Sequence, residues 1–132
     1  MKPRTLLPAG WPKPKGYANG MSATGRLVVT AGVVGWDANE VFASGMTAQC
    51  AQTFANIVAI LAEGHAKPSD VVRLTWYVTS RAAYLAEGKA IGAAYRHAFG
   101  THYPAMAVVE VSSLMEADAL VEIEATAVVG EG

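Results

Sequence analysis

Two glutamates near the end of the chain are the residues with the clearest potential for chemistry. Glu122 and Glu124 stand two apart in VEIEA, within a run of alternating apolar and polar residues. This alternation predicts a strand that carries both carboxylates on one face, about 7 Å apart. An unpaired buried charge is costly, so a carboxylate buried on that face must pair or hold a proton. Two interpretations stay open: a salt bridge between subunits, or a carboxylate whose raised pKa allows proton transfer.

The other residues that could bind a metal or attack a substrate show no such pattern. His65, His97 and His102 have no partner at a spacing typical of metal ligands, so we expect no metal site. Cys50 is the only cysteine and falls on the apolar stripe of a predicted helix, which favours a buried core residue over a nucleophile. The glycines form neither a GxGxxG nor a P-loop pattern, so we expect no site for a nucleotide phosphate.

The composition is typical of one soluble domain. The chain has 132 residues, 52% of them hydrophobic and 16% charged, which is enough for one core but not for two. Its formal net charge is −1, and scattered Lys and Arg residues give no basic surface for nucleic acid. The single cysteine favours a reducing compartment, and we identify no signal peptide or membrane span. We therefore expect a cytoplasmic protein without nucleic-acid or membrane partners.

Hydrophobic periodicity predicts the elements that must position the two glutamates. Alternating or valine-rich stretches predict strands over 26–34, 71–79, 105–111 and 120–129. Apolar spacings of three to four predict a helix over 47–63, with Ser44 as its cap, and a second helix between Ser80 and Gly100. We also expect an early hairpin and a Pro-rich arm at about 1–15. The prediction is a single α+β domain over 1–132, with two helices on one face of a mixed sheet.

The other face of this sheet is expected to lack a cover within one chain. On the last strand, the apolar row that suits the helices consists of Val121, Ile123, Ala125, Ala127 and Val129. Glu122, Glu124 and Thr126 point the opposite way. The same uncovered face is expected to carry Leu27, Val29, Val108 and Val128. An oligomer that buries this face is the economical solution.

Several stretches together resemble the reactive-intermediate (enamine/imine) deaminase family, also called YjgF, L-PSP or RidA. They are GYAN at 16–19, VVTAG at 28–32, FANIVAIL at 54–61, DVVRLTWYVT at 70–79, Tyr-Pro-Ala at 103–105 and VEIEATAV at 121–128. The resemblance implies a chorismate-mutase-like α+β fold and a homotrimer with a central barrel and three ligand clefts between subunits. Family members with a complete site hydrolyse an imine, formed from an enamine such as 2-aminoacrylate, to a keto acid and ammonia. No metal or organic cofactor is implied.

The resemblance also assigns site residues, several of them in changed form. Glu122 matches the glutamate that positions the hydrolytic water, and Tyr17 matches the tyrosine of the cleft. Gly32 keeps the glycine of a turn whose serine and glutamine are replaced here by Ala31 and Val33. In the second helix, Gly92 stands where an asparagine often precedes the tyrosine three residues on.

The most consequential departure is at position 106. Met106 follows Pro-Ala, where the family has an arginine that grips the substrate carboxylate. Loss of this charge-assisted contact should weaken binding of small amino-acid-derived substrates by about tenfold to a hundredfold or more. Methionine suits the wall of a pocket for a larger or less anionic ligand, and Ala31, Val33 and Val108 would make the cleft more hydrophobic still. The sequence does not choose a replacement cation among Arg26, Arg73, Lys89 and Arg96.

Two functions remain as hypotheses. The first is a hydrolytic deaminase of altered specificity, in which Glu122 orients water, Tyr17 holds or protonates the leaving amine, and backbone near Gly32 binds a substrate oxygen. Aminomuconate-type enamines are one substrate class considered for it. The second is a non-catalytic trimeric module that binds a small molecule or a partner. Ribonuclease and chorismate mutase activities are disfavoured, because the sequence offers neither a paired histidine site nor an arginine-rich cleft.

Overall fold

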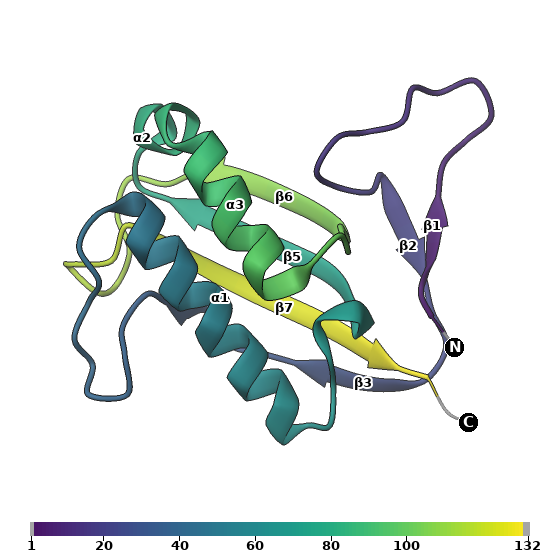
Figure 1. Ribbon diagram of the computed structural model, residues 1–132, viewed down its shortest axis with the longest axis horizontal. Helices are drawn as coiled ribbons and strands as arrows, with labels where there is room; N and C mark the ends of the chain where they lie inside the picture. Colours follow the sequence, from purple (N-terminus) through teal and green to yellow (C-terminus); the bar gives the residue numbers. More distant parts are fainter. Residues whose placement is uncertain (1, 131–132) are drawn as a thin grey trace.

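The main sheet follows the order β3-β7-β5-β6, and the short strand β4 also pairs with β7 (Figure 1). Its strands are β3 Arg26–Val29, β4 Val33–Val34, β5 Val71–Val78, β6 Ala105–Glu110 and β7 Val121–Val129. The pair of β5 and β6 is parallel, whereas β7 is antiparallel to each of its neighbours. This computed structural model describes residues 2–130 and confirms the expected mixed sheet.

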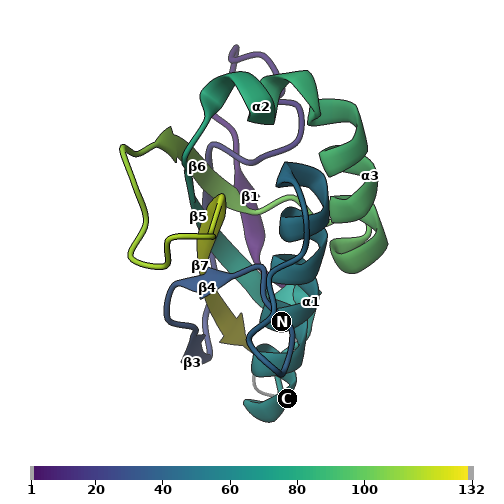
Figure 2. The ribbon, with the colours of Figure 1, turned by 90° about the vertical axis from the view of Figure 1, so that its left-hand side faces the viewer.

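The helices lie on one face of this sheet, and the opposite face has no cover from residues 2–130 (Figure 2). They are α1 Met46–Glu63, α2 Arg81–Ala86 and α3 Gly88–Phe99, with a 3-10 turn, η1, at Pro68–Asp70. The predicted helix between Ser80 and Gly100 is therefore two helices. The Ser80 hydroxyl caps α2 as predicted, accepting a hydrogen bond from the Ala83 amide. No helix among residues 2–130 has the length and hydropathy to cross a membrane.

Glu87, at the break between α2 and α3, is hydrogen-bonded to the start of α1. The Glu87 carboxylate accepts hydrogen bonds from both the backbone amide and the hydroxyl of Thr47, at 3.1 and 2.5 Å. A carboxylate at this position also interacts favourably with the helix dipole. The prediction that Ser44 caps α1 is wrong. The N-cap residue is Gly45, which has a positive φ of 94° and no side chain to cap the helix.

The core lies between the helices and the sheet, and Phe54 of α1 is at its centre. Its ring packs edge-on against Trp76, Tyr95 and Phe99, with centroids 5.3, 5.6 and 5.8 Å away. The apolar row predicted on β7 is confirmed as part of this core. Cys50 is also fully buried there, and burial raises the pKa of its thiol to about 12. A protonated, inaccessible thiol fits the predicted core role.

The strand predicted over 26–34 is interrupted by a bulge. Val29 pairs with Thr126 and Val33 pairs with Ile123, so one extra residue lies on the β3–β4 side. Thr30 bridges the gap: its amide donates to the Ala125 carbonyl at 2.9 Å, and its hydroxyl accepts from the Ala125 amide at 3.1 Å. Such a bulge changes the direction of the side chains that follow. Val33 consequently joins the core, although Val29 points to the uncovered face.

The uncovered face carries both apolar and charged side chains. Leu27 and Val29 are 66% and 59% exposed on β3, and the Tyr77 hydroxyl donates to Glu124 at 2.6 Å on the neighbouring strands. The expectation that Val108 belongs to this face is wrong. Val108 pairs with the buried Trp76, so its side chain points to the helix side, and the next residue of β6 faces outward instead.

The N-terminal arm adds a separate antiparallel pair, β1 Arg4–Leu6 and β2 Gly20–Ser22. This pair fulfils the early-hairpin prediction, but with a long connection over 7–19 instead of a tight turn. The connection is attached to the start of β6 where the Ala18 amide donates to the Pro104 carbonyl at 3.0 Å. Tyr17 is thereby held next to the edge of the main sheet.

Gln49 provides a test of how the loops are attached to α1. Its buried amide group donates to the carbonyls of Ala43 and Asp118 and accepts from the Leu120 amide. Gln49→Met keeps the length of the side chain but leaves these backbone groups without partners. We expect a loss of about 2–4 kcal/mol in the free energy of unfolding, measured by denaturant titration. Glu63→Met, an exposed change on the same helix, should alter it by no more than about 0.5 kcal/mol; similar losses in the two variants would contradict this account.

Candidate functional site

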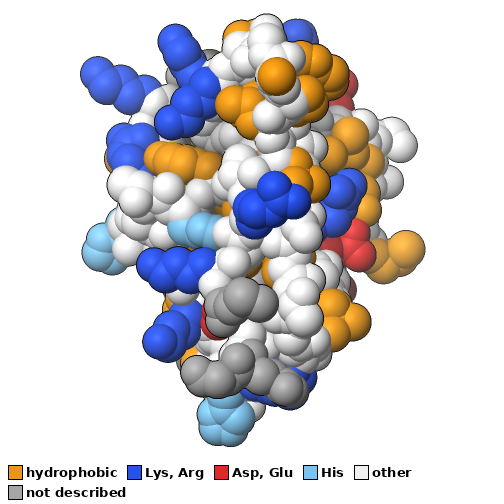
Figure 3. Space-filling view, turned by 90° about the vertical axis from the view of Figure 1, so that its right-hand side faces the viewer, with side chains coloured by type: hydrophobic (Ala, Val, Ile, Leu, Met, Phe, Trp, Pro, Cys, Tyr) orange, Lys and Arg blue, Asp and Glu red, His pale blue; other side chains and the backbone are white. Residues whose placement is uncertain are grey.

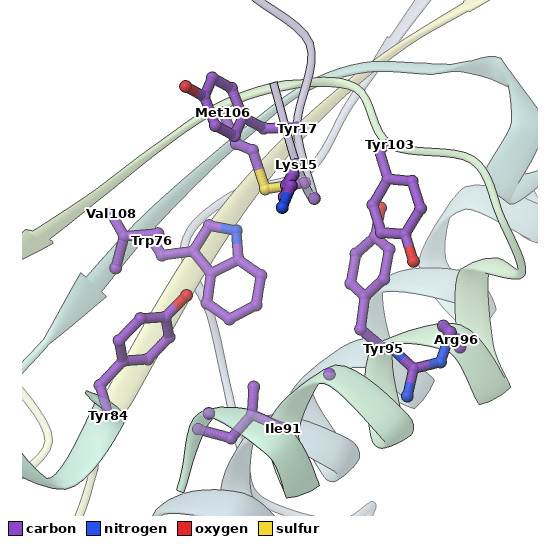
Figure 4. Close-up of a pocket in the computed structure, with 13 residues that line it drawn as sticks. Lys15, Tyr17, Trp76, Tyr84, Ile91, Tyr95, Arg96, Tyr103, Met106 and Val108 are labelled. Atoms are coloured by element: carbon purple, nitrogen blue, oxygen red, sulfur yellow. The ribbon is translucent and has the colours of Figure 1, made fainter. Parts of the chain in front are cut away.

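A cavity of about 610 Å³ opens between α3, β6 and the segment that precedes β2 (Figure 4). The residues that line it are Lys15, Gly16, Tyr17, Trp76, Tyr84, Gly88, Ile91, Gly92, Tyr95, Arg96, Tyr103, Met106 and Val108. This volume is in the range of sites for small organic ligands. The cavity lies at the β6 edge because Met106 and Val108 pair with Leu74 and Trp76, which directs their side chains to the helix side.

Aromatic rings make up much of the cavity wall. Tyr95 and Tyr103 are stacked with centroids 5.3 Å apart, and Trp76 meets Tyr84 edge-on at 5.9 Å. The Tyr95 hydroxyl donates to the His102 carbonyl at 2.6 Å, which fixes the ring. Burial raises the pKa of Tyr84 and of Tyr95, so both phenols are neutral around pH 7. The aromatic part of the wall therefore carries no charge.

Four of the residues singled out in the sequence meet at this cavity. Tyr17, Gly92, Met106 and Val108 all line it, although they come from the N-terminal segment, α3 and β6. In Figure 4 the labelled side chains of Met106 and Tyr17 both border the space. The position that carries arginine in the resembled family thus faces the cavity, with a thioether in place of a charge.

The remaining predicted site residues lie at the other edge of the sheet. Ala31, Gly32 and Val33 line a second cavity, of about 440 Å³, together with Asn56 of α1. The Asn56 amide donates to the carbonyls of Val34 and Trp36 at 3.0 and 2.7 Å, which holds the chain after the bulge.

Glu122 lies directly against this bulge. A Cβ atom added to Gly32 would be only 2.7 Å from the carboxyl carbon of Glu122, so the carboxylate occupies the space that any larger residue would need. Glu122 itself lines neither of the two cavities, and it pairs with Val34 at the β4 side of the sheet. Within one chain, Glu122 and Tyr17 are therefore not brought together.

Sequence reasoning missed several residues of the first cavity. The sequence places Trp76 in a strand, Tyr84 in a helix, Tyr103 in the motif before a strand and Lys15 in an arm. Only the folded register shows that all four line one cavity. Arg96 was one of four possible cations and is the only one of the four that lines this cavity. Arg26 donates instead to the Gly64 carbonyl at 2.8 Å.

The side of the molecule that carries β1 and β2 is rich in Lys and Arg side chains (Figure 3). Among residues 2–130, the lining of the first cavity includes the cations Lys15 and Arg96 and no carboxylate. A search of the same residues finds no group of three His, Cys, Asp or Glu side chains that could hold a metal ion. The electrostatic character of the cavity therefore favours a ligand with negative charge.

The fold and this cavity define a class: an α+β domain with one covered sheet face and a cavity at a sheet edge. Comparisons with known proteins make the class specific. A family model described as "Endoribonuclease L-PSP" matches residues 12–129. A RutC family protein of Pyrococcus abyssi is 33% identical over 118 residues, which are 88% of this chain and 89% of that protein. The chain belongs to this family, the YjgF/RidA family, as its motifs indicated.

Solved structures agree with this assignment. YyfB of Yersinia pestis, described as a protein of unknown function of the conserved Rid protein family, has a TM-score of 0.85 and 32% identity, covering 98% of this chain and 100% of its own. RidA from an Antarctic Psychrobacter species has a TM-score of 0.70 and 26% identity, covering 96% and 99%. The expected fold is thus confirmed.

The contact between Gly32 and Glu122 can be tested with two glycine substitutions. In Gly32→Ala the new methyl group meets a flexible side chain that can rotate away, so we expect a loss of stability below about 1 kcal/mol and a displaced Glu122 carboxylate. In Gly35→Ala the methyl group would lie 2.8 Å from the Gln49 Cα of α1, and we expect a loss of about 3 kcal/mol. Denaturant unfolding and a crystal structure of Gly32→Ala provide the measurements; equal destabilisation by both changes would contradict the geometry.

Proposed function

We propose that this protein hydrolyses enamine or imine intermediates in clefts between the subunits of a homotrimer. The observation that supports the proposal most directly is the Glu122 carboxylate against Gly32 at one sheet edge, with Tyr17 and Met106 around a cavity at the other edge. These are the positions that correspond to the family's site. Membership in a family that includes a protein named RidA supports the same reading.

The separation of Glu122 and Gly32 from Tyr17 and Met106 supports an oligomer. The first pair lies at the β3–β4 edge and the second at the β6 edge of the same sheet. A head-to-tail arrangement of copies brings unlike edges together, and closure of such a ring gives cyclic symmetry. It would also cover the exposed Leu27 and Val29. We propose a trimer because that is the assembly implied by the resemblance to the family.

The proposed reaction adds water across a carbon–nitrogen double bond. Glu122 orients a water molecule and accepts its proton as the oxygen attacks the imine carbon. Tyr17 of the neighbouring copy holds or protonates the nitrogen, and the resulting carbinolamine collapses to a carbonyl compound and ammonia. The backbone near Gly32 lies directly against the Glu122 carboxylate, so a substrate oxygen bound there would be held beside the attacking water. The balance is one imine and one water giving one keto compound and one ammonia.

A second candidate function is a non-catalytic binding module with the same assembly. The presence of Met106 among aromatic side chains favours it, since an apolar cavity can bind a metabolite without converting it. Binding of a ligand without release of ammonia from any imine would favour this alternative.

Glu122→Gln distinguishes the two functions, and the chain offers a matched control. Imines are generated from amino acids by an amino-acid oxidase, and the release of keto acid and ammonia is followed. We expect Glu122→Gln to lower the rate by about 100-fold or more, because general acid–base catalysis contributes about 10²–10⁴-fold. Glu124→Gln lies on the same face of β7 and should retain activity. Unchanged turnover in Glu122→Gln would remove this carboxylate from the mechanism.

The oligomer has its own test on the uncovered face. Leu27→Glu places a charge where subunits are proposed to meet, so we expect light scattering to show smaller species and ammonia release to fall with assembly. Leu85→Glu, an equally exposed leucine position on α2, should leave the assembly intact. A protein that is monomeric before any substitution would contradict the proposed cleft.

A further inference from the structure

The first cavity combines an apolar interior with positive charge at its mouth. Ile91, Met106 and Val108 supply aliphatic surface beside the rings of Trp76 and Tyr103. The charged side chains in the lining are those of Lys15 and Arg96, both of which are exposed. A ligand that satisfies both features has a large apolar or aromatic body and one anionic group.

The indole of Trp76 adds an unsatisfied donor to the cavity wall. Trp76 lines the cavity and is 3% exposed, and its Nε1–H has no hydrogen-bond partner among residues 2–130. The nitrogen lies beneath the surface of the wall, so an acceptor atom of a ligand reaches it only when neighbouring side chains shift. A buried donor without a partner costs about 1–3 kcal/mol. A keto oxygen or an imine nitrogen would satisfy it after such a shift.

The Arg96 guanidinium lies beside Gly92. The two residues are four apart on α3, so they are neighbours on the helix surface. A Cβ atom at Gly92 would lie 3.4 Å from Nη1 of Arg96, which is about van der Waals contact, so the guanidinium borders the space that a longer side chain at position 92 would enter. A larger residue there, such as the asparagine of the resembled pattern, would push the guanidinium out of this place.

Of the two cations in the lining, Lys15 is less suited than Arg96 to bind the anionic group of a ligand. It stands on the extended segment before Tyr17, next to the attachment of Ala18 to Pro104. Arg96 is carried by a helix that packs on the core, and its guanidinium can bind a carboxylate through two parallel hydrogen bonds.

We propose that Arg96, accommodated by Gly92, is the anion anchor of this cavity, and that the ligand is a carboxylate with an aromatic or similarly large planar body. This inference rests on the proposed function in that it names the substrate class of the same cleft. Compared with the resembled family, the cation that binds the carboxylate lies on α3 instead of β6. With methionine at position 106, the cavity can hold a ligand with an aromatic ring instead of one with a short side chain. The preferred substrates are then the imines of aromatic α-keto acids, not 2-aminoacrylate.

The test measures binding by titration calorimetry with three probes: phenylpyruvate, its neutral amide and pyruvate. For the unmodified protein we expect phenylpyruvate to bind at least about tenfold more tightly than pyruvate, because the ring is buried in the cavity. In Arg96→Met the Kd for phenylpyruvate should rise about 10- to 100-fold, whereas the Kd for the amide should change by less than about twofold.

Two further variants complete the design. Lys89→Met removes the same charge from the same helix without touching the cavity lining, and it should leave all three Kd values unchanged. The double variant Arg96→Met with Met106→Arg returns a cation to β6 and should recover binding of pyruvate more than that of phenylpyruvate. Circular dichroism confirms that each variant is folded.

The outcomes separate this inference from the proposed function. Absence of phenylpyruvate binding, equal effects of Arg96→Met on the acid and its amide, or equal effects of Arg96→Met and Lys89→Met would overturn the assignment of Arg96. Arg96-dependent binding without ammonia release would uphold the anchor and refute hydrolysis. Ammonia release from aromatic imines that is indifferent to Arg96→Met would uphold hydrolysis and refute the anchor.

Discussion

The edge-on packing of Phe54 against Trp76 and Tyr95 is the contact on which the cavity depends. It joins α1, β5 and α3, and each of the two outer rings then continues into the cavity wall. Core and site are therefore not separate regions: the same aromatic side chains stabilise the domain and surround the space for a ligand. Such a wall is rigid, because moving either ring would open a void in a closely packed interior.

The helices and strands could be predicted from the sequence, but which side chains of the sheet's edge strands face the helices could not. Alternation over β5 and β7 identified both strands, since each has a covered and an uncovered face. On β6 nearly every residue is apolar, so the sequence does not reveal which ones face the helices. The parallel register with β5 decides it and places Val108 on the helix side of the sheet, where it lines the cavity. The bulge after Val29 could not be predicted from the sequence either. The Thr30 hydroxyl accepts a hydrogen bond from the Ala125 amide and so replaces a backbone acceptor of the ladder, which no residue pattern indicates.

The sequence identified some residues of the first cavity but not how they are arranged. Tyr17, Gly92 and Met106 were identified from motifs, and the fold places them around one space. Arg96 could not be chosen over the other cations without a helix geometry that sets it above Gly92. The separation of Glu122 from Tyr17 could not be predicted from the sequence, because it depends on the strand order, which places β7 beside β3 and β4 and away from β6.

The attachment of the N-terminal segment has a consequence for how relatives of this protein can diverge. One side of the cavity is built by Lys15, Gly16 and Tyr17, which precede every strand of the main sheet and are linked to it by the bond from Ala18 to Pro104. Insertions or exchanges in this stretch would reshape the entrance while the folding of the sheet proceeds as before. In such relatives, ligand preference can change through substitutions in this N-terminal stretch, which is not constrained by the packing of the core.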